Sequence, residues 1–303
     1  MQAKEAEGIT QNTVNNKRAY VRVLMTYLSG IDNEIYPQDL TADHVRGFMR
    51  YLQNDYQLYA NSQKDDKYKT TGLAPASVNT VIRGLRGMFN WLLAEKYITD
   101  NPFLKVRLIK EPKDTVESIE IEEARRLLKE PDQRTFSGFR DYVLYLVMLD
   151  TGVRVSEAIS LQQQDIDLNT NTLHIRAVKS KTKTGRIVPF SKRTSRALRE
   201  LIAELKELDT DYVFVTIYGN TVDRGRVRQK MKQYAKAAGI KSNVSPHILR
   251  HTFAKYYLLN GGDMMTLQKL LGHSTVDMVR RYVQMTQKDV NMTHSKYSPL
   301  RDM

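Results

Sequence analysis

The apolar residues between positions 75 and 94 recur with helical spacing, and this feature restricts the first third of the chain to helical packing. They fall at i, i+3, i+4 and i+7, which places them on one face of an α-helix. They are Val78, Val81, Ile82, Leu85, Met88, Phe89, Leu92 and Leu93. Pro75 suits the first helical turn, and Asn101-Pro102 follows the end of the pattern. A helix with a single apolar face needs partners, so we expect further helices over 13–28 and 43–58, the latter with Asp43 as N-cap.

The pattern changes after residue 105. Residues 61–72 are polar and predict a loop, whereas residues 106–117 lack an apolar period and predict a linker. Beyond it, two hairpins are expected at 165–175 and 177–190. Helices are expected near 120–129, 142–149, 191–208, 224–238, 246–260, 263–271 and 275–283. The predicted fold class is therefore two-domain: an all-α domain over 1–105, and a mixed α+β, mainly helical domain with small antiparallel hairpins over 118–287, followed by a tail at 288–303.

Composition restricts the class of binding partner and the kinds of site chemistry that the chain can have. The net charge is +13, and residues 218–303 hold 15 Lys and Arg against 5 Asp and Glu. This excess favours a polyanionic partner. The chain has no cysteine, which excludes disulfides, iron–sulfur clusters, cysteine-ligated zinc and a thiol nucleophile. Its longest apolar run has eight residues, Tyr142 to Leu149, so we expect no membrane span and a cytoplasmic protein. No basic amphipathic helix with an aromatic face stands apart, so a membrane surface is the less favoured partner.

Four short segments carry groups suited to phosphate chemistry. In Thr151-Gly152-Val153-Arg154, a glycine turn follows a buried helix and an arginine stands at the next helix start. An arginine fixed beside helix N–H groups suits a phosphate. A capping arginine paired with Glu157 would explain the same residues.

The second segment is the tip of the hairpin at 177–190. Its lysines, Lys179, Lys181 and Lys183, alternate and therefore share one face of a strand. A solvated turn would have the same composition. In the third segment, His247 and Arg250 lie three residues apart and project from one helix face. His251 gives the i, i+4 spacing of zinc helices, but no acidic residue lies between the histidines and no third ligand stands out, so we expect no metal site.

The fourth segment is Leu270-Leu271-Gly272-His273, followed nine residues later by Tyr282. A tyrosine on a helix is most often packing, and each of the four segments has an ordinary structural explanation. Their joint occurrence in this order resembles the tyrosine recombinase (phage integrase) family, over about residues 118–285. The residues that carry the resemblance are Arg154, Lys181, His247, Arg250, His273 and Tyr282.

Within this family the hairpin lysine lies eight residues before a proline, and Pro189 therefore selects Lys181. Residues 13–105 resemble the family's core DNA-binding domain in size and pattern alone. Arg280-Arg281, directly before Tyr282, is less typical, and we interpret the pair as phosphate contacts or packing at a protein interface. About a dozen residues precede the first helix, so we expect a simple Xer-like or transposon-type member without an arm-site domain.

The resemblance implies an enzyme that cleaves and rejoins DNA without metal, ATP or another cofactor. Tyr282 would attack the scissile phosphorus and form a 3′-phosphotyrosine. Arg154 and Arg250 would bind the phosphate, and His273 would hydrogen-bond it. Lys181 would protonate the leaving 5′-oxygen, and His247 would help to position Tyr282 or remove its proton. Glu157 would orient Arg154 or His247. A type IB topoisomerase and a non-catalytic DNA-binding regulator are the alternatives.

The resemblance also implies a double-stranded DNA partner carrying a specific recombination site. The expected DNA-binding residues are Arg83, Arg86, Lys179, Lys183, Arg224, Arg226, Arg228 and Lys230. For residues 224–232 a solvated helix face is the alternative. The family further implies a homotetramer on two DNA sites, with a dimer or monomer on one site. The tail at 288–303 would dock on a neighbouring protomer, unless it is a frayed terminus. The expected location is the cytoplasm, in association with the nucleoid.

Overall fold

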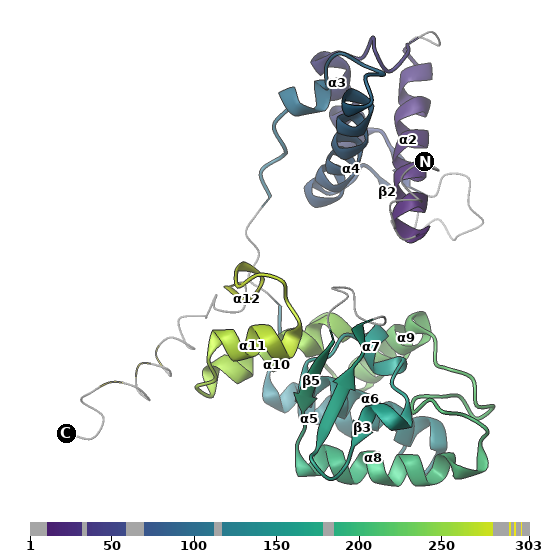
Figure 1. Cartoon of the computed structure of the whole chain (residues 1–303), viewed down its shortest axis with the longest axis vertical. Helices are drawn as coiled ribbons and strands as arrows, with labels where there is room; N and C mark the ends of the chain where they lie inside the picture. The colour runs from purple at the N-terminus through teal and green to yellow at the C-terminus, as the bar shows by residue number, and fades with distance from the viewer. Residues whose placement is uncertain are drawn as a thin grey trace. The chain divides into compact units, whose positions relative to one another are not determined.

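The computed structural model describes residues 11–31, 35–58, 70–111, 117–177 and 185–280, together with positions 291, 294 and 298. The chain divides into two compact units, Met1–Lys113 and Asp114–Met303. Both are mainly helical, as Figure 1 shows, and the second also carries a three-stranded antiparallel sheet. The predicted fold class is confirmed.

The first unit is built on the predicted apolar face of α4 (Pro75–Ala94), which is buried against α2 (Gln11–Ser29) and α3 (Ala42–Asn54). Val78, Ile82 and Phe89 are almost wholly excluded from solvent. A 3-10 turn, η2 (Pro102–Lys105), closes the core, and the rings of Phe89 and Phe103 lie 4.7 Å apart. The three helices thus bury one another's apolar faces, as the spacing of their residues requires.

Helix α3 differs from its prediction at both ends. Its N-cap is Thr41 and not Asp43, because the Thr41 hydroxyl accepts from the His44 N–H while the His44 ring accepts from the Thr41 N–H. Asp43 lies in the first turn and pairs with Arg46 at 2.5 Å. The helix ends at Asn54, and the residues predicted to continue it form a strand instead. This strand, β1 (Gln57–Leu58), pairs with β2 (Thr70–Thr71), which lies at the end of the predicted loop. Two-residue strands carry no apolar period that a sequence could reveal.

Residues 101–111 are held against α4 by side chains of that helix. Arg86 donates from Nε to the Phe103 carbonyl at 3.0 Å and from Nη2 to the Val106 carbonyl at 2.9 Å. Asn79 donates to the Ile109 carbonyl at 2.8 Å and accepts from its N–H at 2.9 Å. The first six residues of the predicted linker therefore lie against α4, and residues 112–116 lie outside the described ranges.

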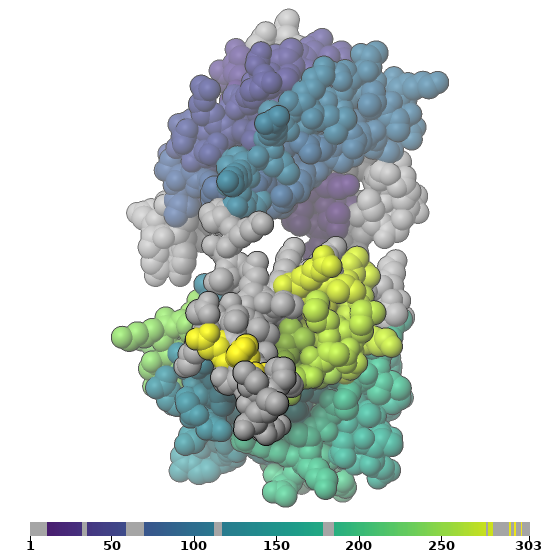
Figure 2. All heavy atoms as spheres, turned by 90° about the vertical axis from the view of Figure 1, so that its left-hand side faces the viewer, coloured from purple at the N-terminus to yellow at the C-terminus, as the bar shows by residue number. Residues whose placement is uncertain are grey.

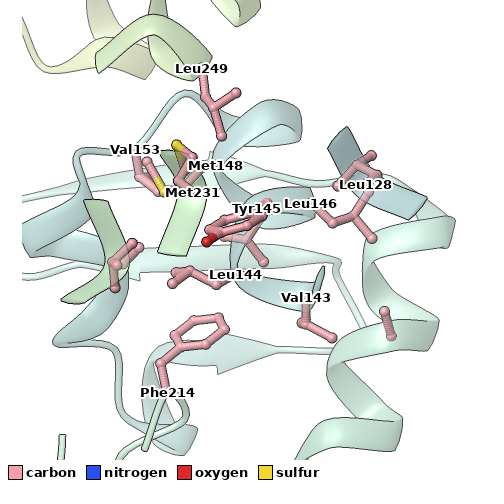
Figure 3. Packing of buried hydrophobic residues seen from close by; sticks show 14 of the residues in the cluster. Leu128, Val143, Leu144, Tyr145, Leu146, Met148, Val153, Phe214, Met231 and Leu249 are labelled. Atoms are coloured by element: carbon pink, nitrogen blue, oxygen red, sulfur yellow. The ribbon is translucent and has the colours of Figure 1, made fainter. Parts of the chain in front are cut away.

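The second unit surrounds α6 (Phe136–Thr151), the predicted buried helix. Residues 143–148 are all buried, and α8 (Lys192–Glu204) and α10 (Pro246–Leu259) pack against α6. Figure 3 shows Tyr145 and Met148 of α6 beside Met231 in this core. The described residues of this unit also form α5 (Ile121–Lys129), α7 (Val155–Ile159), α9 (Arg224–Ala237), α11 (Met264–Leu271) and α12 (Asp277–Arg280). A helix buried on every side has no solvent face, which is why its apolar run is continuous.

The sheet of the second unit joins both predicted hairpins. Its order is β3 (Ile166–Asp167), β4 (Thr172–Ile175), β5 (Arg186–Pro189), with all pairs antiparallel. The single strand β4 serves both hairpins, whereas the sequence predicts a separate strand after residue 177. A short 3-10 turn, η3 (Gln163–Asp165), directly precedes β3, and another, η5 (Leu205–Glu207), directly follows α8. Arg186 lies opposite Ile175 in the register, and residues 178–184, between these two strands in the sequence, lie outside the described ranges.

Helices α11 and α12 lie at the surface of the second unit, where they form the yellow-green area of Figure 2. Leu267, Leu271 and Val279 form a small core there with Ala254 and Leu258 of α10. Across the described ranges, no helix has both the length and the apolar character needed to span a membrane.

Candidate active site

The turn that carries Arg154 is shaped by Gly152. Helix α6 ends there in the left-handed conformation (φ +64°), and a Cβ at this position would lie 2.3 Å from the Phe253 ring. Only glycine fits both requirements. The turn places Arg154 as the N-cap residue of α7, with its side chain 15% exposed. The arginine predicted from the sequence is thus fixed at a rigid corner.

Glu157 organises the charges beside this corner. Its Oε1 accepts from Arg154 Nη1 at 2.9 Å, and its Oε2 accepts from the Arg154 N–H at 2.9 Å. The carboxylate is fully buried, which alone would raise the pKa of Glu157. Hydrogen bonds and charge from Arg186, and then from Arg154, outweigh burial and lower that pKa. The capping pair weighed as an alternative exists, and it fixes the orientation of Arg154.

Arg250 connects the Arg154 turn to the end of α11. It is 4% exposed, and its Nη1 donates to the Gly152 carbonyl at 2.7 Å. Its Nη2 donates to the Leu271 carbonyl at 2.7 Å and meets His273 Nε2 at 2.8 Å. Three of the predicted residues, Arg154, Arg250 and His273, are therefore brought into one place from segments up to 119 positions apart.

His273 is uncharged in this setting. Burial, followed by the positive charges of Arg250, Arg154 and Arg186 and the nearby His251, lowers the pKa of His273 to about 4. An arginine only donates, so Nε2 accepts from Arg250 and the proton of the neutral ring lies on Nδ1. The described part of the site thus holds three guanidinium groups against one carboxylate, an excess of positive charge suited to a phosphate.

One further predicted residue is described, and four are not. His247 lies in the first turn of α10 and is exposed, three positions before Arg250. Lys179, Lys181, Lys183 and Tyr282 lie outside the described residues. Among the residues that are described, no three His, Asp or Glu side chains form a metal-binding group.

Arg186 is a site residue that sequence reasoning did not single out. It donates to Glu157 from Nη1 at 3.1 Å and from Nη2 at 2.7 Å, and from Nε to the Leu270 carbonyl at 2.7 Å. Its side chain is 8% exposed. The alternation along β5 was the available signal, since Val188 is buried and Arg186 lies on the same face.

The basic residues of α9 divide between two faces. Val227, Met231 and Ala235 face the core, and Arg224, Arg226, Arg228 and Lys230 are exposed. Helical geometry puts Arg224 with Arg228 on one face and Arg226 with Lys230 on another. The second pair lines a cavity of about 700 Å³ together with the buried Arg140–Asp141 ion pair.

In the first unit, the two arginines predicted to bind DNA both make internal contacts. Arg86 holds the Phe103 and Val106 carbonyls, and Arg83 pairs with Glu111 at 3.2 Å while its side chain stays 55% exposed. A different basic cluster lies close by. Arg46, Arg50, Lys105 and Arg107 line a cavity of about 480 Å³. We call these four residues the basic cavity; Val106, whose carbonyl Arg86 binds, also lines it.

A second, apolar groove lies on the other unit. It has a volume of about 520 Å³, and its lining includes Ile121, Leu128, Phe253, Tyr256 and Tyr257. We call it the α5–α10 groove. Tyr256 is held in place by a hydrogen bond to Glu120 at 2.8 Å.

Comparisons with known proteins give matches along nearly the whole chain. Residues 117–289 match the model of the phage integrase family, and residues 1–108 match that of the phage integrase SAM-like domain. A tyrosine recombinase XerD from Lacticaseibacillus casei is 30% identical over 274 residues, which cover 87% of this chain and 91% of the relative. A tyrosine recombinase XerD from Listeria innocua is 25% identical over 302 residues, covering 97% and 94%.

Solved structures share the fold. A structure of the XerH site-specific recombinase bound to palindromic difH substrate, a post-cleavage complex, aligns with a TM-score of 0.74 at 18% identity. The alignment covers 96% of this chain and 82% of that one. The Tn1549 transposon integrase in complex with a circular intermediate DNA aligns with a TM-score of 0.73 at 18% identity, covering 97% and 96%.

Proposed function

The chain belongs to the phage integrase family of tyrosine recombinases, and we propose that it is a site-specific DNA recombinase. It cleaves and rejoins DNA strands through a covalent 3′-phosphotyrosine, without metal or ATP. The observation that carries the proposal is the convergence of Arg154, Arg250 and His273 on one rigid corner of the second unit. The XerC and XerD relatives are named as enzymes of this class.

In the reaction we propose, the phenolic oxygen of Tyr282 attacks the scissile phosphorus. The bond to the 5′-oxygen breaks, and Lys181 gives that oxygen a proton. The new phosphotyrosine conserves the energy of the broken bond, so a 5′-hydroxyl from another strand reverses the step without ATP. Both residues are assigned from their positions in the sequence motif.

The arginines stabilise the charge that develops on the non-bridging oxygens. Arg154 and Arg250 present planar guanidinium groups, and each is held before DNA arrives, which avoids reorganisation during the reaction. Once a phosphate oxygen replaces Arg250 at Nε2, neutral His273 hydrogen-bonds the phosphate from Nε2 as the other tautomer. Exposed His247 positions Tyr282 or accepts its proton, because a phenol with a pKa of about 10 is scarcely ionised at neutral pH.

We assign DNA backbone contacts to both units. In the first unit the basic cavity takes this role, with Arg83 as an exposed neighbour, while Arg86 shapes the cavity wall. In the second, we assign this role to α9, through Arg224 with Arg228 or Arg226 with Lys230. We assign it also to Lys179 and Lys183, which lie two positions before and after Lys181 in the sequence. Because its substrate is DNA, we place the protein in the cytoplasm at the nucleoid.

A tetramer on two DNA sites completes the proposal, with a dimer or monomer on one site. The tail residues Val290, Met292, Tyr297 and Leu300 supply apolar side chains, and the α5–α10 groove offers an apolar lining. We propose that the tail of one protomer occupies this groove on the next. Sedimentation of complexes on paired sites tests this, since deletion of residues 289–303 should leave no tetramer, and an unchanged stoichiometry contradicts it.

Strand joining distinguishes a recombinase from its alternatives. Two labelled duplexes that carry the recombination site are incubated with the protein, and recombinant products are measured on a denaturing gel. A plasmid without the site is incubated in parallel. Recombinants with an unrelaxed plasmid support the proposal. Relaxation of the plasmid without recombinants indicates a type IB topoisomerase, and neither product from a bound site indicates a DNA-binding regulator.

A further inference from the structure

We propose that Arg186 is a positioning residue, which holds Glu157 so that Glu157 in turn fixes the Arg154 guanidinium for the scissile phosphate. The inference rests on the proposed function and adds a residue that the family resemblance did not supply. It stands on three features: the engagement of all three guanidinium nitrogens of Arg186, the way two arginines share one carboxylate, and the attachment of Arg186 to the end of α11.

All three nitrogens of the Arg186 guanidinium are engaged inside the protein. Nη1 and Nη2 form a bidentate pair with Glu157, and Nε donates to the Leu270 carbonyl. The Glu157 side chain is 0% exposed and that of Arg186 is 8% exposed. Turning Arg186 toward DNA would break these bonds and leave a buried carboxylate short of partners, which is costly. Arg186 therefore acts on Glu157 and not on the phosphate.

The two oxygens of Glu157 are divided evenly between two arginines. Oε1 accepts from Arg154 Nη1 and Arg186 Nη1, and Oε2 accepts from the Arg154 N–H and Arg186 Nη2. The Arg154 side chain thus contributes Nη1 alone to Glu157, which leaves its second terminal nitrogen for a phosphate oxygen. Without Arg186, one acceptor position opens on each oxygen. The nearest guanidinium, Arg154, would turn into a bidentate pair with Glu157 and away from the substrate.

The attachment to α11 extends this effect to His273. Arg186 and Arg250 bind consecutive carbonyls, those of Leu270 and Leu271, each at 2.7 Å. Gly272 follows with φ +63°, and a Cβ there would lie 2.9 Å from Arg186 Nη1. The helix end can approach the guanidinium so closely because this residue is glycine. Arg186 also opens β5, directly after the connection that carries Lys181. One side chain thus joins the Arg154 corner to the segment before His273.

The test measures single-turnover formation of the covalent adduct on a nicked suicide duplex at saturating protein. The variants are Arg186→Met, Arg186→Lys, Glu157→Gln and the two double variants. The matched control is Arg134→Met, which removes a guanidinium that makes a bidentate pair with Asp132 through Nε and Nη2 (2.9 and 3.0 Å) at an exposed position. Duplex affinity and the thermal midpoint are recorded for each protein.

We expect Arg186→Met to slow adduct formation by up to about 100-fold while duplex affinity stays unchanged, because misplacement of a reacting group acts on the rate. Arg186→Lys keeps the charge but cannot form the bidentate pair, so it restores part of the rate at most. In the Glu157→Gln background either Arg186 substitution should have little further effect. Arg134→Met should match the wild type.

The pH profile provides a readout that a purely structural role would not move. Arg186 and Arg154 face Glu157 from β5 and α7, and the same two arginines act on His273 together with Arg250 and His251. Loss of Arg186 removes the largest favourable influence on the carboxylate and raises the pKa of Glu157. The rate of Arg186→Met should then fall toward acid pH, and the fall should disappear in the Glu157→Gln background.

The outcomes separate this inference from the proposed function. A wild-type protein that forms no adduct contradicts the proposed function itself. A wild-type adduct with an unchanged rate in Arg186→Met overturns the inference alone. Rate losses that multiply in the double variants also overturn it, because Arg186 would then act independently of Glu157. If Arg186→Met unfolds at the assay temperature, Arg186→Lys replaces it in the test. A rate loss from Arg186→Lys that disappears in the Glu157→Gln background supports the inference, and losses that multiply overturn it.

Discussion

Replacement of Arg250 by methionine should cost stability as well as activity, and the two losses are separable. The substitution keeps the apolar stem and removes donors to the Gly152 carbonyl, the Leu271 carbonyl and His273 Nε2. Arg250 is 4% exposed, so water reaches these acceptors poorly. An unsatisfied buried acceptor costs at least about 1 kcal/mol, and three of them give about 3 kcal/mol. For a unit of this size, that lowers the thermal midpoint by about 6–12 °C.

The chain offers a built-in control for this measurement. Its one tryptophan, Trp91, lies on α4 in the first unit, whereas Arg250 lies in the second. Tryptophan fluorescence therefore follows the first unit, and far-UV circular dichroism follows both. In Arg250→Met we expect the tryptophan transition to stay in place while the rest of the dichroism signal melts earlier. A second-unit midpoint equal to that of the wild type would refute the reasoning, because the three hydrogen bonds would then contribute nothing.

Three further predictions follow from the site. Arg154→Met should bind DNA and keep its thermal midpoint while losing about 100- to 1000-fold in adduct formation, since one preorganised donor is removed; a wild-type rate would reject its role. The pKa of His273 is about 4 in the folded protein and about 6.5 when unfolded. The unfolded chain therefore binds more protons between these values, and stability should fall as pH drops from 6.5 to 4. The urea midpoint of His273→Gln should fall less than that of the wild type between pH 6.5 and 4. An equal fall in the two proteins would contradict the lowered pKa of His273. Replacing Arg46, Arg50 and Arg107 with glutamine should reduce the slope of log affinity against log salt by up to about 2.7, whereas the matched triple Arg126, Lys129 and Arg134 should leave it unchanged.

The sequence predicts helices well where the determining pattern is local. The apolar spacing of α4 and the continuous apolar run of α6 follow from which faces are buried. Arg154, Arg250 and His273 were singled out because the order of their segments resembles the tyrosine recombinase family, and the folded chain brings the three together. The strands β1 and β2 were not predicted, because two residues show no period.

Residues whose role depends on distant partners were harder to predict. Arg86 lies off the apolar stripe of α4, as a DNA contact would, but the carbonyls it binds belong to residues 17 and 20 positions later. Arg186 looked like one more charge on a basic hairpin. Its partners, Glu157 and Leu270, are 29 and 84 positions away, and only the folded chain brings them together.

Covalent trapping tests the central claim most directly. The protein is incubated with a nicked suicide duplex in EDTA, and the products are separated on a denaturing gel beside Tyr282→Phe. The account predicts a shifted protein–DNA band for the wild type and none for the variant, with both proteins binding the duplex. A band of equal intensity in Tyr282→Phe would contradict the assigned nucleophile. Absence of any band on a site that the protein binds would contradict the enzymatic function.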